Sequence, residues 1–295
     1  MKDVKMERIS FYDQIRNNKI KSVVLMLCIF LIFVLLGYLI SLAFDKSYFF
    51  IIMVVAIVFS LFYILFTYYY SDQIALASVN AFPASRHQHK QYYDIVEGLC
   101  LASGLPMPKL YIMRSDQINA FATGRNPKNA VICVTTGALE KLNKQELEGV
   151  LAHELSHIAN YDIRFMTLAV VMVGIISIIS ELFLRSLWLS SGREGKNVLL
   201  LLLGILFAIF APFFAMLVQL AISRKREFAA DATAVKFTRS PTGLINALKK
   251  IKNEKPMRVS KAMAPLFISD PFKKIAGLFS THPPIDERIK VLSRM

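Results

Sequence analysis

The stretch "GVLAHELSHIAN" (149–160) contains His153, Glu154 and His157 in the order H-E-x-x-H. Residues four apart lie on one face of a helix, about 6 Å from each other. Both imidazole rings can therefore reach one zinc ion, with Glu154 beside them to take a proton from the attacking water. An ordinary helix with two surface histidines is the alternative. Because two histidines do not complete a zinc site, the stretch predicts a third ligand elsewhere.

The third ligand has several candidates in the sequence. The other histidines are His87, His89 and His282, and acidic residues are numerous. Glu227 is distinctive because Asp231 follows it one helical turn later, in "REFAADA". One carboxylate could bind the metal while its neighbour holds the N–H of a ligating histidine. A solvated acidic pair after the basic "RKR" cluster is the alternative, and spacing alone leaves both readings open.

Long apolar runs identify an integral membrane protein. The chain has 295 residues, 55% of them apolar, and a mean hydropathy of +0.47. The runs 22–44 and 48–70 are uncharged and long enough to cross a hydrocarbon core of about 30 Å. Two further runs, 165–184 and 198–222, predict a second membrane hairpin, although Glu181 interrupts the first of them. A cleavable signal peptide does not fit the first run, because its apolar core would be only about 7–15 residues long.

The formal net charge of +14 indicates membrane flanking rather than nucleic-acid binding. Basic residues gather before the first apolar run and directly after the fourth: Lys2, Lys5, Arg8, Arg16, Lys19, Lys21, Arg224, Lys225 and Arg226. The positive-inside rule therefore predicts that the N-terminus and both soluble parts face the cytosol. The three cysteines are widely spaced and form no C-x-x-C pair, which suits a reducing compartment.

The soluble sequence predicts a mixed α+β domain that the second membrane hairpin divides. A capping box of Asn143 and Glu146 predicts the start of the H-E-x-x-H helix. Other helices are expected at 91–104, after the fourth apolar run, at 241–255 and at the C-terminus, with β-type runs at 109–115, 118–124 and 129–139. The predicted units are a cytosolic segment (1–21), a hairpin (22–70), the first part of the domain (71–164), a second hairpin (165–222) and the second part of the domain (223–295).

Four stretches together resemble the HtpX family of membrane-bound zinc endopeptidases, which are related to the CAAX prenyl proteases. They are "INAFATG" (118–124), "LEGVLAHELSHIANYD" (147–162), "REFAADATA" (226–234) and "THPPIDERI" (281–289). The resemblance covers nearly the whole chain. It implies a zincin-like α+β peptidase domain on a multi-pass anchor of about four transmembrane helices. It also implies one Zn²⁺ per chain, with Glu227 as the third ligand and Asp231 as the residue that orients a ligating histidine.

The resemblance gives roles to residues outside the metal site as well. His282 and Arg288 would line the cleft opposite the general base, where a donor can stabilise an oxyanion. A capped turn and a structural ion pair are the respective alternatives. Asn119, Ala120 and Phe121 resemble the family's edge strand, where an extended substrate pairs by strand addition. Phe121 could equally belong to the core.

The predicted function is a zinc endopeptidase of the cytoplasmic membrane with a cytosol-facing active site, in which Glu154 is the general base. Membrane proteins or unfolded polypeptides are the expected substrates, and the resemblance implies the clearance of damaged membrane proteins. Two alternatives remain. A CAAX-type prenyl-protein protease shares the chemistry, but that family has more membrane spans. A non-catalytic scaffold with a structural metal site would not need Glu154. Oligomeric state is left open.

Overall fold

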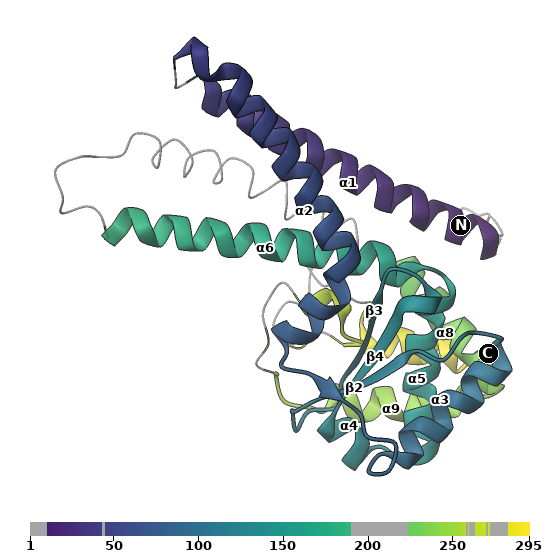
Figure 1. Cartoon of the computed structure of the whole chain (residues 1–295). Helices are drawn as coiled ribbons and strands as arrows, with labels where there is room; N and C mark the ends of the chain where they lie inside the picture. Colours follow the sequence, from purple (N-terminus) through teal and green to yellow (C-terminus); the bar gives the residue numbers. More distant parts are fainter. Residues whose placement is uncertain are drawn as a thin grey trace, which may run out of the picture.

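The computed structural model describes residues 11–42, 45–189, 224–257, 259, 263–269, 271 and 283–295. Two long helices come first, α1 (Phe11–Ser41) and α2 (Phe49–Ser78), joined by the short η1 (Lys46–Tyr48). They form a hairpin that extends away from the body of the molecule (Figure 1). The two helices approach closely, because a Cβ added to Gly37 would lie 2.3 Å from the Cβ of Ala56.

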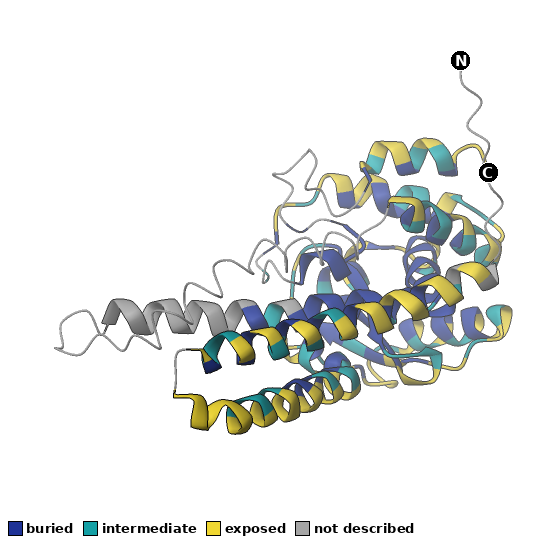
Figure 2. Cartoon of the chain, turned by 90° about the horizontal axis from the view of Figure 1, so that it is seen from above, coloured by how far each residue is buried: buried dark blue, intermediate teal, exposed yellow. Residues whose placement is uncertain are grey.

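The two helices of the hairpin are long and apolar enough to cross a membrane, over Ile15–Ser41 and Lys46–Ser78. Much of their surface is exposed (Figure 2), including Phe50 at 74% and Phe62 at 64%, as lipid-facing side chains would be. These helices contain the first two predicted spans. However, α1 begins at Phe11, well before the predicted start at Ser22.

The third predicted span lies within α6 (Asp162–Leu189). Among the described residues, a third membrane crossing results only if 144–159 and 162–176, bent by 87°, are taken as one broken span. The fourth predicted span, 198–222, lies outside the described residues. Over the residues that the structure describes, two helices are candidate membrane spans, whereas the sequence of the whole chain predicted about four.

A small mixed sheet lies at the centre of the body. Its strands are β1 (Phe82–Pro83), β2 (Lys109–Met113), β3 (Ala120–Gly124) and β4 (Ala130–Thr135), in the order β1-β2-β4-β3. β2 and β4 run parallel, and the other two pairs are antiparallel. The predicted hairpin over 118–139 is confirmed as β3 and β4 joined by η2 (Pro127–Asn129).

The predicted strand 129–139 is too long. β4 ends at Thr135, whose side chain accepts a hydrogen bond from the Ala138 amide and so caps α4 (Thr136–Lys141). A threonine at the N-cap satisfies one of the unpaired amides of the first helical turn, which favours helix over strand from that point. The two-residue β1 was not predicted.

Helices cover the sheet. The central helix is α5 (Lys144–Ala159), and most of its residues are buried by the elements around it. The others are α3 (Lys90–Ser103), α8 (Arg224–Thr238), α9 (Thr242–Lys252) and α10 (Ile285–Leu292), with the short η3 (Ala264–Leu266). The predicted capping box of Asn143 and Glu146 begins α5. Gly149 lets α9 approach at backbone distance, because a Cβ there would lie 2.4 Å from the Leu244 nitrogen. This close packing fixes the position of α5 relative to α9.

Two buried hydrogen bonds join the membrane helices and the sheet to α6. The Tyr63 hydroxyl on α2 donates to the Met172 carbonyl at 2.8 Å, and Thr123 on β3 meets Thr167 at 3.0 Å. Apolar side chains of α1, including Leu25 and Ile29, share a buried cluster with α6. The hairpin is therefore packed onto the element that directly follows α5.

Candidate metal centre

The H-E-x-x-H residues lie on a fully enclosed stretch of α5. His153, Glu154 and His157 are exposed by only 0%, 1% and 6%. The two histidine rings are perpendicular to each other, with their Nε2 atoms 3.2 Å apart. An ordinary helix would expose such residues on its surface, so this burial indicates that the rings point into a built site.

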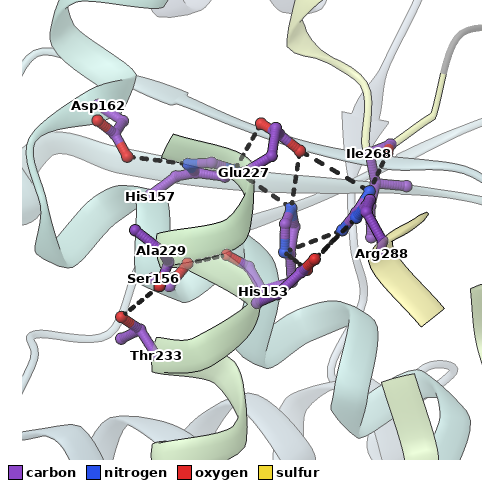
Figure 3. A network of polar contacts seen from close by, with 10 residues as sticks. His153, Ser156, His157, Asp162, Glu227, Ala229, Thr233, Ile268 and Arg288 are labelled. Carbon is purple, nitrogen blue, oxygen red and sulfur yellow. Dashed lines mark hydrogen bonds and ion pairs between the residues drawn. The ribbon is translucent and has the colours of Figure 1, made fainter. Parts of the chain in front are cut away.

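Glu227 on α8, the expected third ligand, lies beside the two histidines, and the three form a group that could hold a metal ion. Its two carboxylate oxygens lie 3.6 Å from the Nε2 atoms of His153 and His157 respectively (Figure 3). Zinc bonds of about 2.0–2.1 Å in a tetrahedral site would separate neighbouring ligand atoms by about 3.3–3.4 Å. The observed spacings of 3.2 and 3.6 Å match that requirement. Two imidazoles and one carboxylate also form the donor set of a catalytic zinc site.

Each histidine of the cluster contacts a carboxylate at its other ring nitrogen. His153 Nδ1 lies 2.9 Å from Asp231 Oδ1. The role expected of Asp231 in orienting a metal ligand stays a prediction. His157 Nδ1 lies 3.1 Å from Asp162 Oδ2, the first residue of α6. This pairing leaves both Nε2 atoms facing the cluster. Sequence reasoning missed Asp162, although it stands in the quoted stretch 147–162.

Arg288 on α10 is fully buried, and its guanidinium contacts Asp231 and His153. Its Nε and Nη2 donate to the two oxygens of Asp231 at 2.9 and 2.6 Å, and Nη1 donates to the Ile268 carbonyl at 3.0 Å. Burial disfavours its charge, but Asp231 raises the pKa of the guanidinium above its usual range. These contacts fix Asp231, and through it His153. The catalytic role expected of Arg288 stays a prediction.

Glu154 carries a carboxylate oxygen, Oε1, that is buried and has no hydrogen-bond partner among the described residues. Burial, together with the charge of Glu227, raises the pKa of this carboxyl to about 7 against the opposing effects of His157, Arg288 and a backbone hydrogen bond from Ala122. A buried polar atom without a partner is costly unless a ligand supplies one. The orphaned oxygen therefore fits a site that receives water or substrate.

The two ligand histidines differ in charge in the metal-free protein. Burial lowers the pKa of His153 to about 4, and Arg288 contributes in the same direction. Burial also acts to lower the pKa of His157, but its hydrogen bond to Asp162 and the nearby carboxylates raise it to about 9. A metal ion must displace the proton from His157, because only a neutral imidazole ligates.

The residues predicted to bind substrate lie at the start of β3, an edge strand of the sheet. Residues 267–269 of the chain itself cover this edge. The Ile268 amide donates to the Ala120 carbonyl at 2.9 Å, and the Asn119 side chain donates to the Ser269 carbonyl at 3.3 Å. Phe121 and Phe267 pack edge to face, with ring centroids 5.1 Å apart. Phe121 is thus a core residue as well as a strand residue.

Of the remaining histidines, the structure describes His87 and His89, and neither joins the cluster. His87 and His89 lie in the turn before α3, where His89 Nδ1 contacts the backbone of Ser85. His282 lies outside the described residues, and its predicted role stays a prediction.

Residues 86–295 match the sequence profile of peptidase family M48. The protein "Protease HtpX homolog" of Thermoanaerobacter pseudethanolicus is 43% identical over 299 residues, which cover 98% of this chain and 99% of that one. The homologue of Caldanaerobacter subterraneus is 49% identical over 237 residues, with coverages of 77% and 79%. A crystal structure of S. mikatae Ste24p aligns with a TM-score of 0.47 at 22% identity, over 94% of this chain and 65% of that one.

The family profile covers the strands β2, β3 and β4 and the helices α5, α8 and α10, and so includes every described residue of the metal cluster. The Thermoanaerobacter homologue, which matches 98% of this chain, extends the similarity through the membrane hairpin. On the combined length and identity of these matches, the chain belongs to peptidase family M48 and, within it, to the HtpX membrane metalloproteases.

Proposed function

We propose that this chain is a zinc-dependent endopeptidase that hydrolyses membrane proteins and unfolded polypeptides at the cytosolic face of the membrane. The single observation that carries the proposal is the convergence of His153, His157 and Glu227 beside the orphaned oxygen of Glu154. A structural metal site gains nothing from a buried carboxylate kept free next to its ligands. The arrangement therefore favours catalysis over a scaffold role.

Zinc and Glu154 would carry different parts of the reaction. Zinc, when bound, supplies a Lewis acid that activates water and polarises the scissile carbonyl. Glu154 accepts the proton of the attacking water and delivers it to the leaving amine. A carboxyl pKa near the working pH suits this exchange, because the group must both accept and release the proton. Asp231 and Asp162 keep the two imidazoles in the tautomer that ligates.

Substrate binding requires a rearrangement of residues 267–269. The backbone groups of even-numbered residues in β3 point to the outer edge, where the Ala120 carbonyl already accepts from Ile268. An extended substrate that pairs with Asn119–Phe121 must therefore displace this segment. We propose that the segment leaves β3 when substrate arrives, so that only a polypeptide already in extended form competes for the edge.

The proposed orientation follows from charge and contacts together. The N-terminal part of α1 carries Arg16, Lys19 and Lys21 and lies against the peptidase body. The positive-inside rule assigns such segments to the cytosol. We propose that 1–21, 71–164 and 223–295 share that side, and that 22–70 and 165–222 form two membrane hairpins. Clearance of damaged proteins from the same membrane is the proposed physiological role.

The decisive experiment compares two variants of the full-length protein in detergent. Glu154→Gln keeps all three ligands, so zinc content should stay near one per chain while cleavage of a casein-type unfolded substrate falls by orders of magnitude. Glu227→Ala should lose both zinc and activity after dialysis, because two histidines alone make a poor site. Glu97→Gln, at a half-buried carboxylate on α3 that pairs with Arg86 away from the cluster, is the matched control and should change neither. Cleavage by Glu227→Ala at the wild-type rate, with zinc retained, would remove this metal site from the mechanism.

A further inference from the structure

A membrane helix reaches the metal centre through one asparagine. Asn18 lies on α1 before its apolar run and is 3% exposed. Its Nδ2 donates to Asp162 Oδ1 at 2.6 Å and to the Asn160 carbonyl at 3.0 Å. Asn160 lies in the connection between α5 and α6, and Asp162 is the first residue of α6. The side-chain amide of Asn18 therefore bonds to residues on both sides of Tyr161, in the turn that follows the H-E-x-x-H helix.

The carboxylate of Asp162 serves two partners with separate oxygens. Oδ1 accepts from Asn18, and Oδ2 lies 3.1 Å from His157 Nδ1. Asn18, Asp162 and His157 thus form a continuous buried chain from the membrane hairpin to a metal ligand. The orientation of the imidazole depends on the orientation of this carboxylate, since the hydrogen bond at Nδ1 fixes both tautomer and ring plane.

The turn between α5 and α6 depends on α1 at a second point. Tyr161 adopts a positive φ of 58°, a conformation that non-glycine residues rarely take. The Lys19 ammonium, next to Asn18, lies 4.6 Å from the centre of the Tyr161 ring. Contacts from α1 therefore support a turn that the backbone alone does not favour.

We propose that Asn18 is a positioning residue through which docking of the first membrane helix sets the metal affinity of the site. The proposal rests on the metal centre proposed above. Without the amide, the Asp162 oxygen and the Asn160 carbonyl lose a buried donor, and the carboxylate is free to turn away from His157. We expect zinc affinity to fall about tenfold, at the lower end of the range for partners of metal ligands.

The test measures zinc affinity by competition with a chromophoric chelator, in the full-length protein in detergent. Asn18→Ala should weaken zinc binding about tenfold. Ser22→Ala is the matched control, because Ser22 is fully buried one turn further along α1 and its hydroxyl bonds to the Asn18 carbonyl, not to Asp162. It should leave zinc affinity unchanged. Thermal unfolding of the metal-free variants reports any general loss of α1 packing, which a merely structural role would show without a change in affinity.

An exchange of the two side chains tests the contact itself. Asn18→Asp places two carboxylates together and should lower zinc affinity below that of Asn18→Ala. Adding Asp162→Asn restores an amide–carboxylate pair, so the double variant should bind zinc more tightly than the two single losses together predict. If Asn18→Ala fails to fold, the comparison of Asn18→Asp with the double variant tests the contact instead.

Three results would overturn the inference: wild-type zinc affinity in Asn18→Ala, an equal loss in Ser22→Ala, or no coupling in the double variant. A wild-type protein that binds no zinc, or whose binding survives Glu227→Ala, would instead contradict the proposed metal centre. The failure of the inference and the failure of the function are thus distinguishable.

Discussion

Arg288→Met should destabilise the protein and its metal site together, rather than slow the chemistry alone. The guanidinium is fully buried and makes two charge-assisted hydrogen bonds to Asp231 and one to the Ile268 carbonyl. Methionine fills much of the volume but leaves the Asp231 carboxylate buried without its countercharge. Breaking one side of a buried ion pair costs about 3–5 kcal/mol. His153 also loses a fixed partner, so zinc affinity should fall about 10–100-fold.

The assay is denaturant unfolding followed by circular dichroism, with and without zinc, alongside zinc competition. The double variant Arg288→Met with Asp231→Asn removes both charges and keeps an oxygen for His153 Nδ1. It should recover most of the lost stability, since removing a whole buried pair costs far less than breaking it. The reasoning is refuted if Arg288→Met keeps wild-type stability and zinc affinity while proteolysis drops about 10²–10³-fold. That pattern is the signature of a lost oxyanion donor.

Three further predictions follow from the site and its surroundings. Zinc affinity should rise by about one log unit per pH unit between about pH 5 and 8, because zinc displaces one proton from His157 while His153 is already neutral; a flat profile by chelator competition would contradict those charge states. Binding of a strand-like, uncleavable peptide should speed hydrogen exchange at the Ile268 amide, which loses the Ala120 carbonyl; continued protection would mean that residues 267–269 stay in place. Reporter tags at both termini should register the cytosol, and an external signal at either end would overturn the proposed orientation.

Short-range signals explain why α5 and its ligands could be predicted from sequence. The capping box of Asn143 and Glu146 spans three residues, and His153 and His157 lie one turn apart, so both patterns are visible within one helix. Asp231 could be predicted for the same reason, as the neighbour of Glu227. The proximity of both carboxylates to His153 on α5 was expected only through the family resemblance.

Contacts between distant segments account for most of what was missed. Asn18 and Asp162 are 144 residues apart, and no local pattern connects them. The family resemblance placed Arg288 in the cleft, with a structural ion pair as the alternative; the structure shows a buried bidentate contact with Asp231, 57 residues away, which no local pattern indicates. β1 contains two residues, one of them Pro83, and is too short to leave a periodic signal. The parallel pairing of β2 and β4 likewise depends on tertiary packing.

The segment that covers β3 has a thermodynamic consequence for substrate choice. Because residues 267–269 belong to the same chain, they compete for the edge as an intramolecular ligand, with an effective concentration in the millimolar range for a short tether. A dilute soluble peptide cannot match that concentration. A polypeptide anchored in the same bilayer is itself confined close to the site. Its local concentration at the β3 edge is then comparable with the effective concentration of the segment. Confinement to the membrane would then discriminate between substrates before any side chain is recognised.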